Sequence, residues 1–351
     1  MRASGITLLH AVAVCVSTYS NVSGNTQGKQ KYTPSNAYNP SKTQVIQDRR
    51  HQPEYCGYEE HCPDAEDIHP CVCTYYNEVA MDLECSGLEG EDQLRQVFSA
   101  DFPIKNFRRF IMYSNNNLKV LESSVFNGIS FEWISIEQSQ LEVIEMHAFD
   151  SCYETTTYIR LLMNNITSFP FDDLFHFSKL SYFALSNNLL DMIPANAFNG
   201  LSALETLDLE YTTSNFVGTF ENLPNLRSIF LEHNDLTDIP GNFIKAGSYN
   251  LRYIYLNSNS IVSVEPGAFD IVAGLEFYIY GNSLSTLDEA TWRSLLEAGG
   301  VLDPRYNPLI CGCDVAWLFG EDQLLNQTHL DTSCSDGQYL HRLDPSSFDN
   351  C

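Results

Sequence analysis

The chain has 351 residues, 44% of them apolar, and a formal net charge of −26 at pH 7. So acidic a protein repels nucleic acid and anionic membranes, and this charge excludes both as partners. The apolar content suffices either for two or three compact domains or for one elongated array of repeats with capped ends, and the residue pattern decides between them.

The first 55 residues indicate a leader followed by a polar linker. Residues 1–23 carry a positive charge at Arg2, then a short apolar core, Ile6–Val16, and then small residues. This order is typical of a secretory signal. That core is too short to span a bilayer, and no run of about 20 apolar residues occurs elsewhere. Residues 24–55 are polar without a hydrophobic period and are predicted to be a disordered linker. The sequence therefore predicts a secreted, extracellular protein without membrane insertion.

Cysteines concentrate at the two ends of the remaining chain. Eleven occur in all, and the ten that remain once Cys15 leaves with the signal are an even number, as expected in an oxidising compartment. Only Cys152 lies far from the ends. We expect residues 56–103 and 311–351 to be cysteine-rich caps, because the end coils of a solenoid expose an apolar cross-section that disulfides can staple shut. The Cys71-x-Cys73 spacing does not suit a zinc finger, so no metal is predicted.

A repeated pattern occupies residues 104–310. Its clearest copy is Leu180–Phe198, where the spacing L-x-x-L-x-L-x-x-N-x-L is that of a leucine-rich repeat. Successive copies are 22 to 25 residues apart when aligned on the ninth position, which is occupied by Asn115, Ser139, Asn164, Asn188, Thr212, Asn234, Asn259, Asn282 and Asn307. This period predicts an α/β solenoid, a leucine-rich-repeat horseshoe of about nine coils with a parallel sheet on its concave side and disulfide-stapled N- and C-terminal caps.

The outward positions of the predicted strands form a candidate partner-binding site. Aromatic and acidic residues dominate these positions, and the candidates are Trp133, Tyr158, Tyr182, Asp208, Glu210, Phe230, Glu232, Tyr253, Tyr255, Tyr278 and Tyr280. Protein interfaces favour such aromatic residues, so the pattern indicates a concave binding face. The alternative interpretation is that aromatic residues simply suit strands and pack side by side on the sheet.

Three local features add to this outline. The repeat around Thr212 and Ser214 lacks the usual Asn and Leu, which predicts a kink, a docking point or a tolerated defect. Asn165-Ile-Thr and Asn326-Gln-Thr are sequons for N-glycosylation.

No catalytic constellation is present in the sequence. It contains neither a Gly-rich phosphate loop nor a His-Glu-x-x-His motif, and its histidines form no triad spacing. Asp208, Glu210 and Glu232 could serve as acid and base only in a desolvated site, which an open solenoid face does not offer. The sequence therefore predicts a protein that is not an enzyme and needs no cofactor.

The cysteine-rich ends resemble known sequence flanks. The segment Asn307-Pro-x-x-Cys-x-Cys313-x-x-x-Trp317 resembles the C-terminal flank of extracellular leucine-rich-repeat proteins, and the cysteines from Cys62 to Cys85 resemble the matching N-terminal flank. This resemblance implies the disulfides Cys62–Cys73, Cys71–Cys85, Cys311–Cys334 and Cys313–Cys351. It leaves Cys56 and Cys152 unassigned.

A narrower resemblance points to a function. The segments Cys62–Cys73, Met81–Ser86 and Phe169-Pro-Phe171 resemble a set of secreted arthropod leucine-rich-repeat proteins that is similar to the non-catalytic subunit of a shrimp luciferase. The resemblance implies an accessory, stabilising role beside a small catalytic oxygenase subunit bound on the aromatic concave face. The alternative is an extracellular recognition protein for matrix, guidance or innate-immune ligands, with no enzyme partner.

Overall fold

The computed structural model describes residues 61–77, 80–212, 216, 220–320 and 324–351. All of them belong to one unit of the chain, Gly57–Cys351. The predicted signal and linker, together with Cys56 and Ser214, lie outside the described residues.

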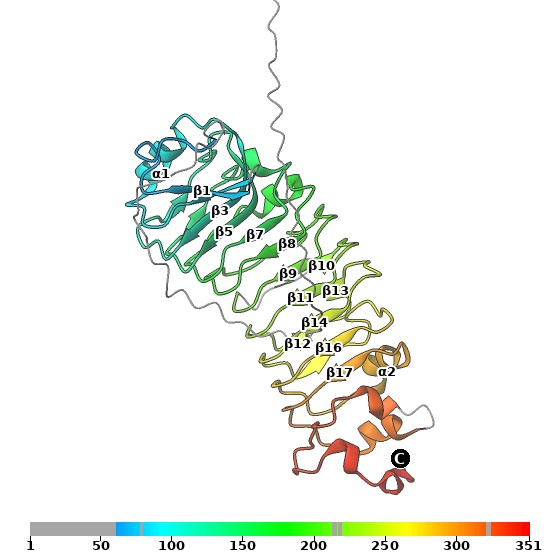
Figure 1. Cartoon of the computed structure of the whole chain (residues 1–351). Helices are drawn as coiled ribbons and strands as arrows, with labels where there is room; N and C mark the ends of the chain where they lie inside the picture. Colours follow the sequence, from blue (N-terminus) through cyan, green and yellow to red (C-terminus); the bar gives the residue numbers. More distant parts are fainter. Residues whose placement is uncertain (1–60, 78–79, 213–215, 217–219, 321–323) are drawn as a thin grey trace, which may run out of the picture. The chain divides into compact units, whose positions relative to one another are not determined.

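An eleven-stranded sheet runs through this unit, and its strands lie side by side in chain order (Figure 1). The strands are β1 (Val72–Asn77), β2 (Ala80–Glu84), β3 (Asn106–Tyr113), β5 (Ser130–Glu137), β7 (Tyr158–Arg160), β8 (Tyr182–Ala184), β9 (Thr206–Asp208), β11 (Ser228–Phe230), β14 (Tyr253–Tyr255), β16 (Glu276–Tyr278) and β17 (Val301–Asp303). Strands β1 and β2 pair antiparallel, and from β2 to β17 every neighbouring pair is parallel. Each repeat therefore adds one strand to the sheet.

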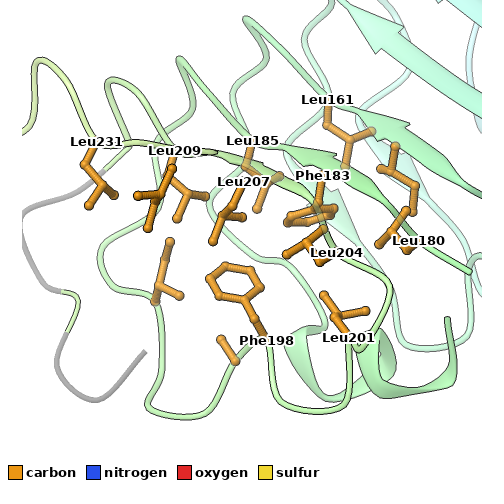
Figure 2. Packing of buried hydrophobic residues seen from close by; sticks show 14 of the residues in the cluster. Leu161, Leu180, Phe183, Leu185, Phe198, Leu201, Leu204, Leu207, Leu209 and Leu231 are labelled. Carbon is orange, nitrogen blue, oxygen red and sulfur yellow. The ribbon is translucent and has the colours of Figure 1, made fainter. Parts of the chain in front are cut away.

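The hydrophobic core lies directly beneath this sheet. In each short strand the middle residue is buried and its two neighbours face outward, as Ile159, Phe183 and Leu207 show in consecutive coils. Figure 2 shows Phe183 and Leu207 pointing toward Phe198 and Leu201, which come from the far side of the coil. Each such side chain contributes roughly 1.5–3 kcal/mol when fully buried. A single coil is too thin to enclose them, so stability requires stacking.

A ladder of inward polar side chains joins one coil to the next. All nine predicted ladder positions are buried. The Asn188 amide nitrogen donates to the carbonyl oxygens of Leu161 and Leu185, both at 2.7 Å, and its oxygen accepts the backbone N–H of Ile166 at 3.1 Å. Since Leu161 and Ile166 belong to the preceding coil, the ladder satisfies backbone groups of two coils at once. At position 139 a serine takes the place of the asparagine, and its hydroxyl oxygen accepts a hydrogen bond from the backbone N–H of Asn115 at 2.9 Å.

The residue before each ladder position adopts a left-handed backbone. Its φ lies between 48° and 67° at Ser114, Gln138, Met163, Asn187, Tyr211, His233, Ser258, Gly281 and Tyr306. Glycine adopts this conformation freely, and asparagine, aspartate and histidine are enriched in it, so the other six of these nine residues give no sign of it in the sequence. The turn redirects the chain from the sheet to the edge of the coil.

The far side of the coils is irregular. Three two-stranded parallel sheets and two short 3₁₀ helices occur there, namely β4 (Val120–Leu121) with β6 (Val143–Ile144), β10 (Phe220–Glu221) with β13 (Ile244–Lys245), β12 (Asp238–Ile239) with β15 (Ser263–Val264), η1 (Asp150–Cys152) and η2 (Phe171–His176). These segments vary in length from coil to coil, which accounts for the varying spacing of the repeat.

Caps close both ends of the array. The N-terminal cap contains β1, β2 and α1 (Glu91–Phe98). The C-terminal cap contains η3 (Cys313–Phe319), η4 (Leu324–Gln327), η5 (Leu340–Arg342) and η6 (Pro345–Phe348), and it packs against α2 (Glu289–Glu297), which precedes the last strand of the sheet. Four disulfides staple the caps and join the pairs that the resemblance implies: Cys62–Cys73, Cys71–Cys85, Cys311–Cys334 and Cys313–Cys351. The predicted solenoid with a parallel sheet and stapled ends is confirmed.

Cys152 is fully buried and forms no disulfide with a described residue. Burial raises the pKa of its thiol to about 11, which keeps it protonated and unreactive.

Candidate binding surface

The outward side of the large sheet is defined here as the strand face. In each coil it comprises the outward-facing residues of the strand and one further outward residue, two positions after the strand ends. In the coil of β9 these residues are Thr206, Asp208 and Glu210. All eleven predicted partner-binding residues lie on this face. Trp133 is 43% exposed, and the other ten are half-buried.

A first aromatic ladder crosses β5, β7 and β8. The ring centroids of Trp133 and Tyr158 are 4.8 Å apart, those of Tyr158 and Tyr182 are 4.2 Å apart, and the rings are nearly parallel. The three residues are aligned because the strands pair in register. Neighbouring strands lie about 4.8 Å apart, a spacing that suits stacked rings.

A second aromatic ladder crosses β11, β14 and β16. Phe230 stacks on Tyr255 and Tyr255 on Tyr278, each with a centroid distance of 4.7 Å. Tyr253 lies 6.2 Å from Tyr255 on the same strand. Tyr280 faces Arg305, whose guanidinium carbon is 5.6 Å from the ring centroid. The side-by-side packing of the alternative interpretation is therefore present, and the stacking covers the faces of these rings rather than their edges.

Three carboxylates, defined here as the acidic centre, lie between the two ladders: Asp208, Glu210 and Glu232. The Ser186 hydroxyl donates to Asp208, and the His233 Nε2 atom lies 4.0 Å from a Glu210 oxygen. Within the described part of the chain, no lysine or arginine pairs with any of the three. The Glu232 Oε2 atom is buried and has no hydrogen-bond partner among the described residues.

Burial and mutual repulsion change the protonation of this centre. Burial raises the pKa of Glu232 to about 7, and the charges of Glu210 and Asp208 act in the same direction. The pKa of Glu210 is also raised, first by burial and then by Asp208. A carboxyl group with a pKa near 7 is partly protonated at neutral pH, so the acidic centre carries less negative charge than three ordinary carboxylates would.

Several other acids on the strand face are paired with arginines, although the exposed Glu84 on β2 is hydrogen-bonded only by the Ser86 hydroxyl among the described residues. Asp82 contacts both Arg108 and Arg109, and Glu137 lies 3.4 Å from Arg160. At the other end, the Glu276–Arg252 and Asp303–Arg305 pairs are 3.2 Å and 2.7 Å long. The three carboxylates between the two ladders are thus a cluster of acids on this face without a lysine or arginine partner among the described residues.

Sequence reasoning missed the contribution of β2 to this face. Asp82 on β2 lies opposite Arg109 on β3. The signal was available, because Met81, Leu83 and Cys85 alternate as buried residues in the way the repeat strands do.

Other kinds of site find little support in the described residues. No cluster of three or more His, Cys, Asp or Glu side chains among them could hold a metal ion. A hollow of about 940 Å³ lies away from the strand face, beside α1, and is lined largely by charged residues including Glu91, Asp92 and Arg95. Across the described part of the chain, no helix combines the length and the apolar character needed to cross a membrane.

The two sequons occupy different surroundings. Asn165 is half-buried on the turn that follows the ladder residue Asn164, whereas Asn326 is exposed in η4. Glycosylation of either residue remains a prediction.

Comparisons with known proteins place the chain in a family. The family model described as "Leucine rich repeat" matches residues 154–213, 178–236 and 224–284. The chain belongs to the leucine-rich-repeat family. Within it, the chain is 30% identical over 313 residues to the Oplophorus-luciferin 2-monooxygenase non-catalytic subunit of Oplophorus gracilirostris, an alignment that covers 82% of this chain and 87% of that protein.

Two further likenesses are more distant. Podocan of Mus musculus is 28% identical over 190 residues, which are 46% of this chain and 31% of that protein. Among solved structures, a chain of the octameric complex of Latrophilin 3, Unc5D and FLRT2 superposes with a TM-score of 0.56 at 19% identity, over 76% of this chain and 90% of that chain. This structural likeness concerns the fold.

Proposed function

We propose that the chain is a secreted, non-enzymatic binding module that holds a partner protein on its strand face and serves as an accessory, stabilising subunit. The observation that carries the proposal is its relationship to a protein named as the non-catalytic subunit of a monooxygenase, over 82% of the chain. By that relationship the partner is a small catalytic oxygenase subunit. Extracellular placement is supported by the four disulfides.

The strand face is the favoured docking surface because of its charge and its rings. An acidic centre that has a histidine but no lysine or arginine beside it attracts a lysine or arginine side chain from another protein. The two ladders on either side offer amphipathic aromatic edges, which are enriched at protein interfaces. We therefore expect a partner that presents a cationic side chain to Glu232 and flanks it with apolar or aromatic residues.

An accessory role agrees with the chemistry of the acidic centre. Burial raises the pKa of Glu232 and Glu210, so this part of the face is more desolvated than the sequence suggested, but all three carboxylates belong to the outward side of an open sheet. We accordingly assign them to recognition and assign the oxidation chemistry to the partner.

Capture from the native extracellular fluid tests the accessory role. The secreted chain is immobilised, bound proteins are identified by mass spectrometry, and the eluate is assayed for light emission with a coelenterazine-type luciferin. Recovery of a small protein together with light output supports the accessory-subunit role. Recovery of other proteins without light would replace it with the alternative, an extracellular recognition protein for matrix, guidance or innate-immune ligands.

Tyr255→Ala tests the strand face itself. This ring is sandwiched between Phe230 and Tyr278, so its loss breaks the second ladder. Truncation of a central aromatic residue at an interface costs about 2 kcal/mol, and we expect the affinity for the captured partner to fall about 30-fold. Tyr249→Ala is the matched control, because Tyr249 is 93% exposed and lies outside the strand face. If Tyr255→Ala binds the captured partner with the same affinity as wild type, the partner docks elsewhere.

A further inference from the structure

Two adjacent asparagines of the third coil have opposite roles. The Asn164 amide nitrogen donates to the carbonyl oxygens of Ile136 at 2.9 Å and Leu162 at 3.0 Å, so its side chain is committed to the ladder. The side chain of Asn165 makes no hydrogen bond with any described residue, although its backbone N–H donates to Leu141. Asn165 begins the sequon Asn165-Ile-Thr, and its amide nitrogen is free to react.

Exposed apolar side chains gather around this sequon. Met163, two residues before Asn165, is 50% exposed. Leu189 is 59% exposed and lies beside the sequon in the next coil, where its backbone N–H donates to the Ile166 carbonyl oxygen at 2.9 Å. Met192, three residues further on, is 52% exposed.

These apolar residues depart from the pattern of the other coils. Met163 precedes a ladder residue, a position that is polar at Ser114, Gln138 and Ser258 but holds an exposed aromatic residue at Tyr211 and Tyr306. Leu189 follows a ladder residue, a position occupied by Gln140, Asp235 and Ser260 in other coils. Beside the sequon, exposed apolar residues occupy both the position before one ladder residue and the position after the next. A group of exposed apolar residues favours a cover that keeps it from self-association.

We propose that Asn165 carries an N-linked glycan whose inner sugars cover the apolar edge formed by Met163, Leu189 and Met192. In the transfer step, the Asn165 Nδ2 atom forms a bond to C1 of the first sugar of a lipid-linked oligosaccharide. The bond from C1 to the pyrophosphate oxygen breaks, the lipid pyrophosphate leaves, and the amide gives up one proton. The glycan is bulky and hydrophilic, so it replaces exposed apolar surface with a solvated one. This inference rests on the secretion that the proposed function includes.

The test uses the full chain secreted from eukaryotic cells. Mass spectrometry of glycopeptides reports whether Asn165 and Asn326 are modified. The glycans are then removed enzymatically from the folded protein, and Asn165→Gln is prepared separately in case its secretion is impaired. We expect either treatment to raise the fluorescence of the apolar dye 1-anilinonaphthalene-8-sulfonate about twofold or more and to increase self-association measured by light scattering.

Two comparison variants make the result specific. Asn326→Gln removes the other sequon, on an exposed 3₁₀ helix, and should leave dye binding unchanged. Asn165→Gln combined with Leu189→Ser and Met192→Ser should return dye binding to the wild-type level. An unmodified Asn165 beside a modified Asn326 would overturn the proposal while leaving secretion intact. So would unchanged dye binding after glycan removal, or a triple variant that binds as much dye as Asn165→Gln.

Discussion

At the scale of the residue, Glu232 shows how neighbours alter an ordinary side chain. One of its oxygens is buried without a hydrogen-bond partner among the described residues, and two further carboxylates lie close by. Burial disfavours the charged form, so the pKa of Glu232 rises from the usual 4.5 to about 7. The folded chain therefore retains a proton that the unfolded chain releases over this pH range.

This difference predicts how stability depends on pH. The stabilisation linked to the raised pKa of Glu232 is complete below about pH 4.5 and is lost as the pH rises through about 7. Glu232→Gln removes the titration, so between about pH 5 and about pH 8 wild type should lose about 1–3 kcal/mol of unfolding free energy relative to the variant. Melting temperatures of both proteins across this range provide the measurement. Glu154→Gln, at an exposed acid, is the control and should follow wild type. If the melting temperatures of wild type and Glu232→Gln changed with pH in parallel, the raised pKa of Glu232 would be refuted.

At the scale of the element, one coil cannot be separated from the next. Asn188 binds backbone groups of its own coil and of the preceding one, and all of these groups are removed from water. The left-handed residue before it, Asn187, turns the chain so that the amide points inward. The strand, the turn and the amide ladder thus form one structural unit that repeats.

Asn188→Ala tests the ladder. The substitution leaves two carbonyl oxygens and one N–H group buried without their partner, and we expect a loss of about 2–4 kcal/mol in unfolding free energy. The melting temperature should fall by about 5–10 °C. Asn116→Ala, at an exposed asparagine of the first coil, should change it little. An equal effect of the two substitutions would mean that the ladder contributes nothing beyond its backbone geometry.

At the scale of the whole unit, the caps decide where unfolding begins. Each coil of a solenoid contacts only its neighbours, so the end coils depend on what covers them. Trp317 belongs to the C-terminal cap, and its indole N–H donates to the Leu287 carbonyl oxygen at 2.9 Å. The disulfide Cys313–Cys351 closes a chain segment with a sequence separation of 38 residues and holds η3 against the C-terminus.

The double variant Cys313→Ser with Cys351→Ser tests this role. Opening a loop of that length should cost up to about 4 kcal/mol. Because coils are coupled only to their neighbours, we expect amide hydrogen exchange to accelerate most in α2 and β17 and progressively less toward β9. Cys62→Ser with Cys73→Ser should instead accelerate exchange near β1 and β2. Exchange that accelerates uniformly along the chain would contradict unfolding from the ends.

The repeat, the strand positions and the outward residues follow from the sequence alone, because they depend on local periodicity. The alternation that buries Phe183 and turns Tyr182 outward spans only a few residues. The pairing of the cap cysteines also followed from the sequence, by resemblance to known flanks. The sequence pattern was too weak to predict the helices α1 and α2 or the left-handed residue of each coil.

Only the tertiary structure decided what the strand face is chemically. The stacking of Tyr158 on Tyr182 depends on the register between strands that lie 24 residues apart in the chain. The isolation of Glu232 depends on which side chains the neighbouring coils bring within reach, and burial sets its pKa. Local periodicity specifies which residues point outward. Contacts between coils, which sum over residues distant in sequence, determine which of them are stacked, paired or left charged.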